Sequence, residues 1–441
     1  MSKTIIFDDL AAPQFTWQQR AILSLADQRE VQLEMYPILK AASDSTGLND
    51  FGPDDFKQRM AVLLEDYNSD DEMTNVGRGQ MYEDLLRCAR NRLLIQERLN
   101  RTPDIDQLAL APPLSVSGLP RSGTTHLVNL LAADTRFQSL PLWRIQEPFH
   151  VSGQEQATVG LKFKAWLMRT LLGSSDTAHR DPRYLRCSLR WSGMQIMAPN
   201  LAAMHPMNPD HIHEELELMT YDFASNQFEW TAVVPKYRDF YLASDQTPHY
   251  EYLLRVLKLL SLQEGSGRAF VLKCVQNPEQ LPALKHILPD ATAILTHRDP
   301  VAVIQSTATM IAYGHRILRS KVDPRAVLDY WTERFEKLLR ACVRDREVWP
   351  AEQSLDIMFH EFMADQQGTI ERIYEHHGQR HPDMQLTAAA RQQMDDFIAN
   401  HPRGKYGRVK YKLKEYFGVD ADQLRQRFDF YFDAFPVQPE L

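Results

Sequence analysis

The sequence predicts an α/β fold in which a P-loop-like central parallel sheet is flanked by helices and follows a helical N-terminal region. Three observations predict this fold. Residues from about 17 to 105 show helical apolar spacing without a strand pattern. Short apolar runs then alternate with helical patterns, the order expected of a parallel sheet with crossover helices. A glycine-bearing turn joins the first of these runs to a helix, as in phosphate-binding loops.

The same patterns divide the chain into a helical region and a domain that contains the sheet. Residues 1–110 are expected to form the helical region, with an amphipathic stretch at Met81–Leu99 and a loop at Asp44–Asp55. Residues 111–441 are expected to form the domain that contains the sheet. Within that domain, an irregular and proline-interrupted stretch over about 150–260 is expected to be an insertion.

Four short apolar runs are expected to be the strands of the sheet. Each is bounded by turn or helix signals and is short enough for a buried strand. The runs are Pro113–Val116, Ala269–Leu272, Ala291–Leu295 and Leu355–Phe359. The flanking helices are expected at Thr124–Ala133, Glu279–Ile287, Val301–Ala312 and Arg325–Val343.

The bulk composition indicates an ordinary globular chain. The 441 residues are 44% hydrophobic and 24% charged, with a formal net charge of −8. That charge argues against a broad nucleic-acid surface, although a local basic site could still hold a nucleotide. No apolar stretch approaches the roughly 20 residues of a membrane helix, and the four cysteines lack metal-ligand spacing. We expect a cytoplasmic protein with reduced thiols, no nucleic-acid partner and no integral membrane segment.

The segment Ser115–His126 has the order of a phosphate cradle, with a strand, a tight turn and a helix start. Backbone N–H groups of such a turn and the positive end of the helix converge on an anion. Gly118 and Gly123 keep the glycine spacing of nucleotide-triphosphatase loops, but Thr124 stands where those loops carry lysine. Arg121 is the only cation inside the turn. The loop is therefore predicted to bind phosphate groups without hydrolysing a triphosphate.

Two further basic segments follow along the chain. Arg298 lies at the end of an expected strand, and Ser306 lies about two helical turns further on. A guanidinium offers phosphate a charged planar fork, and a hydroxyl adds a neutral donor. Nearer the C-terminus, Arg403, Gly404 and Lys405 combine cations with a glycine that permits close backbone approach.

The run Pro120–Thr125, which reads Pro-Arg-Ser-Gly-Thr-Thr, resembles the 5′-phosphosulfate loop of sulfotransferases. The resemblance extends over roughly Asn49–Phe435 and is strongest to bacterial sulfotransferases with an added helical N-terminal region. It implies 3′-phosphoadenosine 5′-phosphosulfate (PAPS) as the donor of a sulfuryl group, and it implies no obligatory metal.

The resemblance also implies which residues bind the donor. The phosphosulfate loop would supply Arg121, Ser122, Gly123, Thr124 and Thr125. The 3′-phosphate would be bound by Arg298 and Ser306 and covered by a loop that contains Arg403, Gly404 and Lys405.

Catalysis would require a cation near the transferring group and a base for the proton of the acceptor. Lys273 follows the expected strand Ala269–Leu272, and the resemblance implies that this lysine contacts the transferring group. Two positions where related bacterial sequences often carry a base are altered here, to Asn277 and Arg144. Three candidates for the base therefore remain open, namely His205, Glu147 and Glu214.

The acceptor is expected to bind in the insertion. The stretch Met194–Tyr241 is dense in apolar and aromatic residues, most of which are expected in the core. The remainder predict a hydrophobic alcohol or phenol as the acceptor. His211, His213 and nearby carboxylates could bind zinc, but the zincin spacing fails, so no metal site is predicted.

Two other functions remain open. A P-loop kinase would need the loop lysine and an acidic strand end for magnesium, but Thr124 replaces the first, and the relevant strands end at Lys273 and Thr296. A non-catalytic adenosine-nucleotide-binding protein would account for Arg144 and Asn277 at the two altered positions. A homodimer is compatible with each of these functions.

Overall fold

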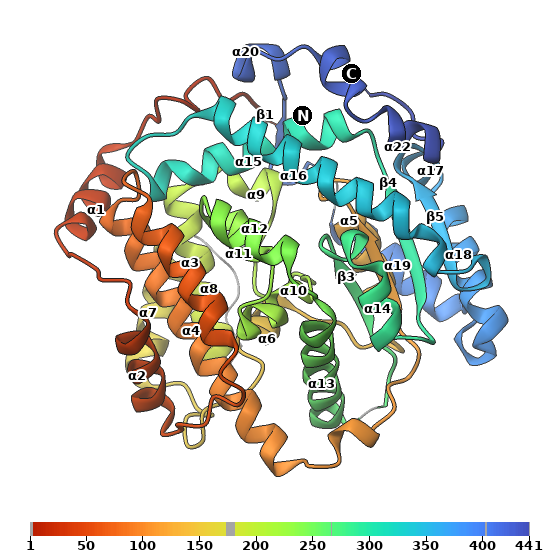
Figure 1. Cartoon of the computed structure of the whole chain (residues 1–441), viewed down its shortest axis with the longest axis horizontal. Helices are drawn as coiled ribbons and strands as arrows, with labels where there is room; N and C mark the ends of the chain where they lie inside the picture. The colour runs from red at the N-terminus through yellow and green to blue at the C-terminus, as the bar shows by residue number, and fades with distance from the viewer. Residues whose placement is uncertain (1–2, 173–180, 266, 402–403, 441) are drawn as a thin grey trace.

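The computed structural model describes residues 3–172, 181–265, 267–401 and 404–440 (Figure 1). Its central sheet has four parallel strands in the order β3-β2-β4-β5. Their bounds are β2 Leu114–Gly118, β3 Val271–Cys274, β4 Thr292–His297 and β5 Ser354–Met358. The predicted α/β fold is confirmed, and so are the four expected strands, each shifted by no more than a few residues.

These strands form because each is a short apolar run that packs on both sides. Every residue of β2, β3 and β4 is buried, as expected of parallel strands that helices cover. β2 lies between β3 and β4, with Val116 opposite Lys273 on one side and Ile294 on the other. The carboxyl ends of the three strands therefore meet at one edge of the sheet, where ligands of open α/β sheets bind.

Alternate residues of the strands belong to two different apolar clusters, which shows that helices pack on both faces of the sheet. The helices of the sheet-containing part are α5 Thr124–Ala133, α13 Thr247–Glu264, α14 Leu281–Ile287, α15 Pro300–Leu318, α16 Pro324–Asp345, α17 Phe359–Ala364, α18 Gln366–Arg380 and α19 Ala388–Asn400. The chain between α5 and α13 forms α6 Leu142–Gln146, α7 Val159–Leu172, α8 Pro182–Met197, α9 Leu201–Met204, α10 Leu216–Met219, α11 Gln227–Thr231 and α12 Pro235–Ala243. The last helices are α20 Leu413–Phe417, α21 Ala421–Gln426 and α22 Asp429–Ala434.

The N-terminal region is helical, as the sequence predicts. Its helices are α1 Trp17–Asp27, α2 Met35–Thr46, α3 Phe56–Ser69 and α4 Asn75–Arg101. The expected loop at Asp44–Asp55 begins later than predicted, because α2 continues to Thr46. Gly47 ends the helix with a φ of 71°, a left-handed conformation that glycine adopts without steric cost.

The helices α3 and α4 share one apolar core with the sheet-containing part. Leu63 of α3 and Leu93 of α4 belong to the same cluster as Leu218 and Leu257. The warm colours of α3 and α4 lie directly against the green elements that follow β2 (Figure 1). The helical region therefore packs directly against the sheet-containing part. The division of the chain into two domains near residue 110 stays a prediction.

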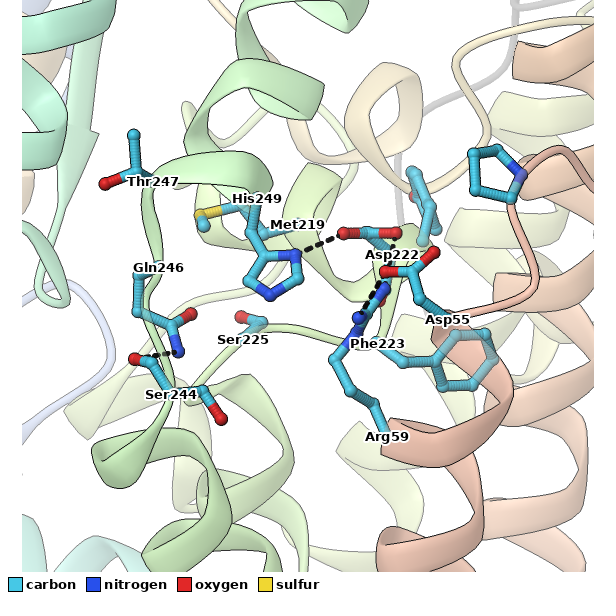
Figure 2. A network of polar contacts seen from close by, with 12 residues as sticks. Asp55, Arg59, Met219, Asp222, Phe223, Ser225, Ser244, Gln246, Thr247 and His249 are labelled. Atoms are coloured by element: carbon cyan, nitrogen blue, oxygen red, sulfur yellow. Dashed lines mark hydrogen bonds and ion pairs between the residues drawn. The ribbon is translucent and has the colours of Figure 1, made fainter.

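A buried network of charged side chains links helices α3 and α4 to the rest of the protein (Figure 2). The Asp222 carboxylate accepts hydrogen bonds from Arg59 at 2.9 Å, from Arg92 at 2.6 Å and from His249 at 2.6 Å. Burial by itself would raise the pKa of Asp222, but the His249 hydrogen bond and the two guanidinium charges hold it below 3.8. Because Arg59 lies on α3 and Arg92 on α4, this single carboxylate links both helices to the rest of the chain.

One small sheet was not predicted. β1 Thr4–Ile5 pairs in parallel with β6 Arg408–Val409, which joins the first described residues to the C-terminal part. Strands of this length are too short to show the alternation by which strands are predicted.

Replacing Asp222 tests the link between the N-terminal helices and the body of the protein. Asp222→Asn leaves the buried Arg92 guanidinium without its countercharge and Arg59 with its ion pair to Asp55 alone, so we expect the free energy of unfolding to fall by about 3–5 kcal/mol. Asp329→Asn removes an exposed ion pair with Arg325 and should cost about 0–1 kcal/mol. Urea unfolding followed by circular dichroism measures both values. Equal losses for the two variants would contradict the role of Asp222.

Candidate active site

A cavity of about 1550 Å³ lies at the edge of the sheet where the strands end. A residue that follows each strand lines it: Pro120 after β2, Val275 after β3, Arg298 after β4 and Phe359 after β5. The parallel order of the strands therefore directs four segments that are distant in sequence into one space.

The loop between β2 and α5 forms one wall of the cavity. Its cavity-lining members include Arg121, Gly123, Thr124 and Thr125. Gly123 has a φ of 86°, and no side chain caps the start of α5. The N–H groups of the first helical turn thus lack an intrahelical acceptor and are available to an anion. Ser122 is buried within the loop, where its hydroxyl lies 2.7 Å from that of Thr296.

Arg121 connects the loop to the second predicted segment. Its φ of 64° is unusual for a residue other than glycine, and such strained backbone is concentrated at functional sites. The Arg121 Nε donates to Ser306 Oγ at 3.0 Å, and the Arg121 carbonyl accepts from the Arg298 guanidinium. Another of its N–H groups approaches the Tyr411 hydroxyl at 3.5 Å. The structure therefore places Arg121, Arg298 and Ser306 in contact.

The Arg298 guanidinium is held between an aromatic ring and a carboxylate. It lies over the Phe359 ring at 4.0 Å from the ring centre. Its Nε and Nη2 donate to the two oxygens of Glu440, each at 2.6 Å. The N–H of Glu440 in turn donates to Asp299 at 2.8 Å. A carboxylate thus occupies the fork of donors that an anionic ligand would use.

The third predicted segment lies at the same cavity. Gly404 and Lys405 line it, whereas Arg403 lies outside the described residues. The turn is held in place where the Arg408 N–H donates to the Lys3 carbonyl at 2.8 Å. The small sheet of β1 and β6 therefore positions the basic turn beside the cavity.

Lys273 reaches the cavity from the end of β3. This lysine is only 3% exposed, and its Nζ forms an ion pair with Glu214. The other carboxylate oxygen of Glu214 accepts from the Val275 N–H at 3.0 Å. A buried ammonium is stable only with such a partner, so Glu214 is the countercharge of Lys273.

A second glutamate braces the end of β3. Glu215 accepts hydrogen bonds from the Lys273 N–H at 2.8 Å and from the Asn277 side chain at 3.1 Å. Tyr250 donates to Asn277 at 2.8 Å. Burial raises the pKa of Glu215 to about 7. Asn277, at one of the altered base positions, therefore helps to hold the strand end that presents Lys273.

Three histidine rings cluster near Lys273. The ring centre of His205 lies 5.9 Å from that of His211 and 5.8 Å from that of His213. Burial, the two other histidines, Lys273 and Arg121 lower the pKa of His205 well below 6.5. Burial likewise lowers the pKa of His211 to about 3. Both rings are therefore neutral at pH 7, which is the state in which an imidazole can accept a proton.

Within the described ranges, no group of three or more histidine, cysteine or acidic residues has a geometry that could hold a metal ion. In the same ranges, every helix falls short of the length and apolar character that crossing a membrane requires.

Glu147, the third candidate base, lies apart from this cluster. Its two oxygens accept from Arg186 Nε at 2.8 and 3.1 Å, and the described residues that line the cavity do not include it. Arg144, at the other altered base position, forms an ion pair with Glu264. The structure thus brings His205 and Glu214 to Lys273 and leaves Glu147 outside the cavity.

Part of the cavity lining is apolar. Helix α8 supplies Trp191, Met194 and Met197, α15 supplies Met310 and Ile311, and α11 supplies Phe228 and Trp230. Other aromatic residues of the same stretch, Tyr221, Phe223, Tyr237 and Tyr241, are buried in the core. The N-terminal helix α4 also forms a wall through Gly79, Gln80, Arg87 and Cys88, a contribution that the sequence did not indicate.

Sequence reasoning missed three residues that contact the predicted anion-binding arginines, namely Glu440, Phe359 and Tyr411. None of them belongs to a recognisable motif. Glu440 is separated from Arg298 by 142 positions and Tyr411 from Arg121 by 290 positions, so only the folded chain brings them together. Phe359 directly follows β5, and its position at a strand end was the one available signal.

Comparisons with known proteins bear on the family and the fold of the chain. The model of a family described as the sulfotransferase family matches residues 112–383. The crystal structure of sulfotransferase STF1 from Mycobacterium tuberculosis H37Rv has a TM-score of 0.73 at 24% identity, covering 91% of this chain and 99% of that one. The structure of sulfotransferase STF9 from Mycobacterium avium has a TM-score of 0.75 at 22% identity, covering 93% and 98%. At these identities the two structures show a shared fold. No curated protein matches the chain.

Proposed function

The chain belongs to the sulfotransferase family, and from that premise we propose that it transfers a sulfuryl group from PAPS to a hydroxyl or amine of an apolar small molecule. One observation carries the proposal. The β2–α5 loop, Lys273, Arg298 and Ser306 come from separate segments and line a single cavity. Family membership supports sulfuryl transfer in general, and the residues of the cavity support a choice of donor and acceptor.

The donor would bind across the two arginines. The phosphosulfate group would lie against the first turn of α5 and the side chains of Thr124 and Thr125, where the helix end favours an anion. The 3′-phosphate would take the fork of Arg298 and the hydroxyl of Ser306, displacing the carboxylate of Glu440. Gly404 and Lys405 would close beside it.

Transfer then requires that the S–O bond to the donor break while an S–O or S–N bond to the acceptor forms. The bond between the sulfuryl sulfur and the 5′-phosphate oxygen breaks, the acceptor oxygen or nitrogen bonds to the sulfur, and adenosine 3′,5′-bisphosphate leaves. Lys273 would stabilise the negative charge that develops on the bridging oxygen. Neutral His205 would take the proton from the acceptor, because it lines the cavity near Arg121 and Lys273 and stays unprotonated at pH 7.

The acceptor would bind in the apolar part of the cavity. The methionine and tryptophan side chains of α8 and α11 offer apolar contact without a charge to pair, which fits a hydrophobic alcohol or phenol. The Nε2 of His211 is buried and has no hydrogen-bond partner among the described residues, so it can bind a polar group of the acceptor. On this proposal residues 1–110 supply part of the acceptor wall through α4, and residues 111–441 hold the donor site.

A transfer assay with sulfur-labelled PAPS tests the proposal directly. We expect label to appear on at least one acceptor of a panel containing a phenol, a steroid and a fatty alcohol. Lys273→Met combined with Glu214→Gln removes the ammonium without leaving a buried unpaired carboxylate, and should abolish transfer while adenosine 3′,5′-bisphosphate still binds.

Calorimetry of nucleotide binding distinguishes the proposed reaction from other functions. Binding of the bisphosphate without transfer to any acceptor would favour a non-catalytic binder, and a preference for Mg–ATP would favour a kinase.

The ion pair between Arg298 and Glu440 predicts the effect of two substitutions on donor affinity. Glu440→Gln removes the carboxylate that competes with the ligand for Arg298. We therefore expect adenosine 3′,5′-bisphosphate to bind about two- to fivefold more tightly, a change that corresponds to the free energy of a partly exposed ion pair. Arg298→Ala should weaken binding by about 2–4 kcal/mol, since a charge-assisted contact is lost. Titration calorimetry measures both, and unchanged affinity in both folded variants would remove Arg298 from the donor site.

The positions of the candidate bases predict different kinetics. His205→Asn should lower kcat about 10²–10⁴-fold, because the acceptor loses its base. Glu147→Gln should leave kcat nearly unchanged, since Glu147 pairs with Arg186 away from the cavity. The lowered pKa of His205 also predicts that kcat/KM stays constant as the pH falls through 6.5 and drops only well below it. A larger loss for the glutamate variant would assign the base to Glu147.

A further inference from the structure

Helix α7, Val159–Leu172, carries an unusual set of exposed apolar side chains. Val159 is 84% exposed, Phe163 57%, Trp166 55% and Leu167 41%. The rings of Phe163 and Trp166 lie against each other with their centres 5.8 Å apart. Together these four residues form what we call the α7 patch. Exposed apolar side chains are ordinary when scattered singly, but a contiguous group of this kind indicates an interaction surface.

The spacing places the α7 patch on one stripe of the helix. The positions 159, 163, 166 and 167 follow the intervals that align residues along a helical face. Lys162 and Lys164, both exposed, lie on either side of this stripe at about 100° per residue. The helix contains no aspartate or glutamate. An apolar stripe with aromatic residues and flanking lysines is the pattern of a helix that lies in the interface of a membrane.

The opposite side of α7 fixes the helix to the protein. Ala165 is buried, and with the partly buried Leu161 it packs on Leu185 and Leu189 of α8 in a small cluster separate from the main core. Other residues of α8, Trp191 among them, line the cavity. The α7 patch therefore lies on the outer side of the same helix that forms a wall of the apolar cavity.

We propose that α7 docks the protein onto the surface of an anionic lipid bilayer, with the α7 patch inserted at the level of the headgroups. Phe163, Trp166 and Leu167 would enter the apolar boundary, and Lys162 and Lys164 would pair with lipid phosphates. The docking would place the wall of the cavity next to a source of apolar molecules. This docking surface is independent of the proposed reaction.

Charge favours a bilayer over a second copy of the chain as the occupant. In a symmetric dimer the same surface meets itself, so the lysines of one α7 would face those of the other without an acidic residue on the helix to balance them. The α7 patch also holds four side chains, whereas a stable interface usually takes about 20–30 residues from each partner. Anionic headgroups neutralise both lysines at once.

Flotation of the full chain with lipid vesicles tests the proposal. We expect binding to vesicles that contain one quarter phosphatidylglycerol in phosphatidylcholine, and weaker binding to phosphatidylcholine alone. Phe163→Ser combined with Trp166→Ser should lower the bound fraction about tenfold, and Lys162→Gln combined with Lys164→Gln should lower it about tenfold on the anionic vesicles. Because these side chains are exposed, the thermal midpoint should stay that of the wild type.

The control replaces exposed apolar residues elsewhere. Leu262→Ser combined with Val348→Ser removes side chains that are 46% and 39% exposed outside α7, and should leave vesicle binding unchanged. Failure of the wild type to bind anionic vesicles would overturn the proposal, as would equal losses in the control. A wild-type dimer in sedimentation velocity that becomes a monomer on Phe163→Ser/Trp166→Ser would overturn it in favour of a second copy. None of these readouts requires PAPS or turnover, so they stand apart from the transfer assay.

Discussion

Hydrogen bonding among three parallel strands determines where chemistry can occur in this chain. With β2 between β3 and β4, the loop after Gly118, the lysine at the end of β3 and the arginine after β4 all reach the same edge of the sheet. A sheet of buried parallel strands tolerates no slip of register, because every residue packs on one face or the other. The spacing between Arg121, Lys273 and Arg298 therefore depends on the core rather than on the loops that surround them.

Two cations of the site form ion pairs with protein carboxylates. Glu214 pairs with Lys273, and Glu440 pairs with Arg298. Buried or half-buried cations are costly without a partner, so each carboxylate keeps a positive group in place for an anionic ligand. The two glutamates differ in their other hydrogen bonds. The Glu214 carboxylate also accepts from the N–H of Val275, whereas Glu440 is linked to Asp299 through its backbone N–H. Donor binding would therefore exchange Glu440 and leave Glu214 in place.

The sequence predicted the sheet well, because buried parallel strands are recognisable as short apolar runs. It also indicated Arg121, Arg298 and Ser306, because their spacing forms motifs, and the structure brings these three into contact. Other features had no local signal. The carboxylate on Arg298 comes from a remote segment, the strands β1 and β6 are too short for periodicity, and the wall contributed by α4 depends on how the helical region packs. Sequence alone could not choose among the bases either, since burial and ion pairing separate His205 from Glu147.

Hydrogen–deuterium exchange of the full chain with and without adenosine 3′,5′-bisphosphate tests whether this cavity is the donor site, because it reports on every segment of the site at once. We expect slower exchange in residues 119–126, where the first turn of α5 would bind the phosphate, and in residues 404–411 of the basic turn. We expect faster exchange around residue 440, where the N–H of Glu440 would lose its bond to Asp299. Protection confined to other segments, or no protection at saturating bisphosphate, would contradict the assignment of this cavity as the donor site.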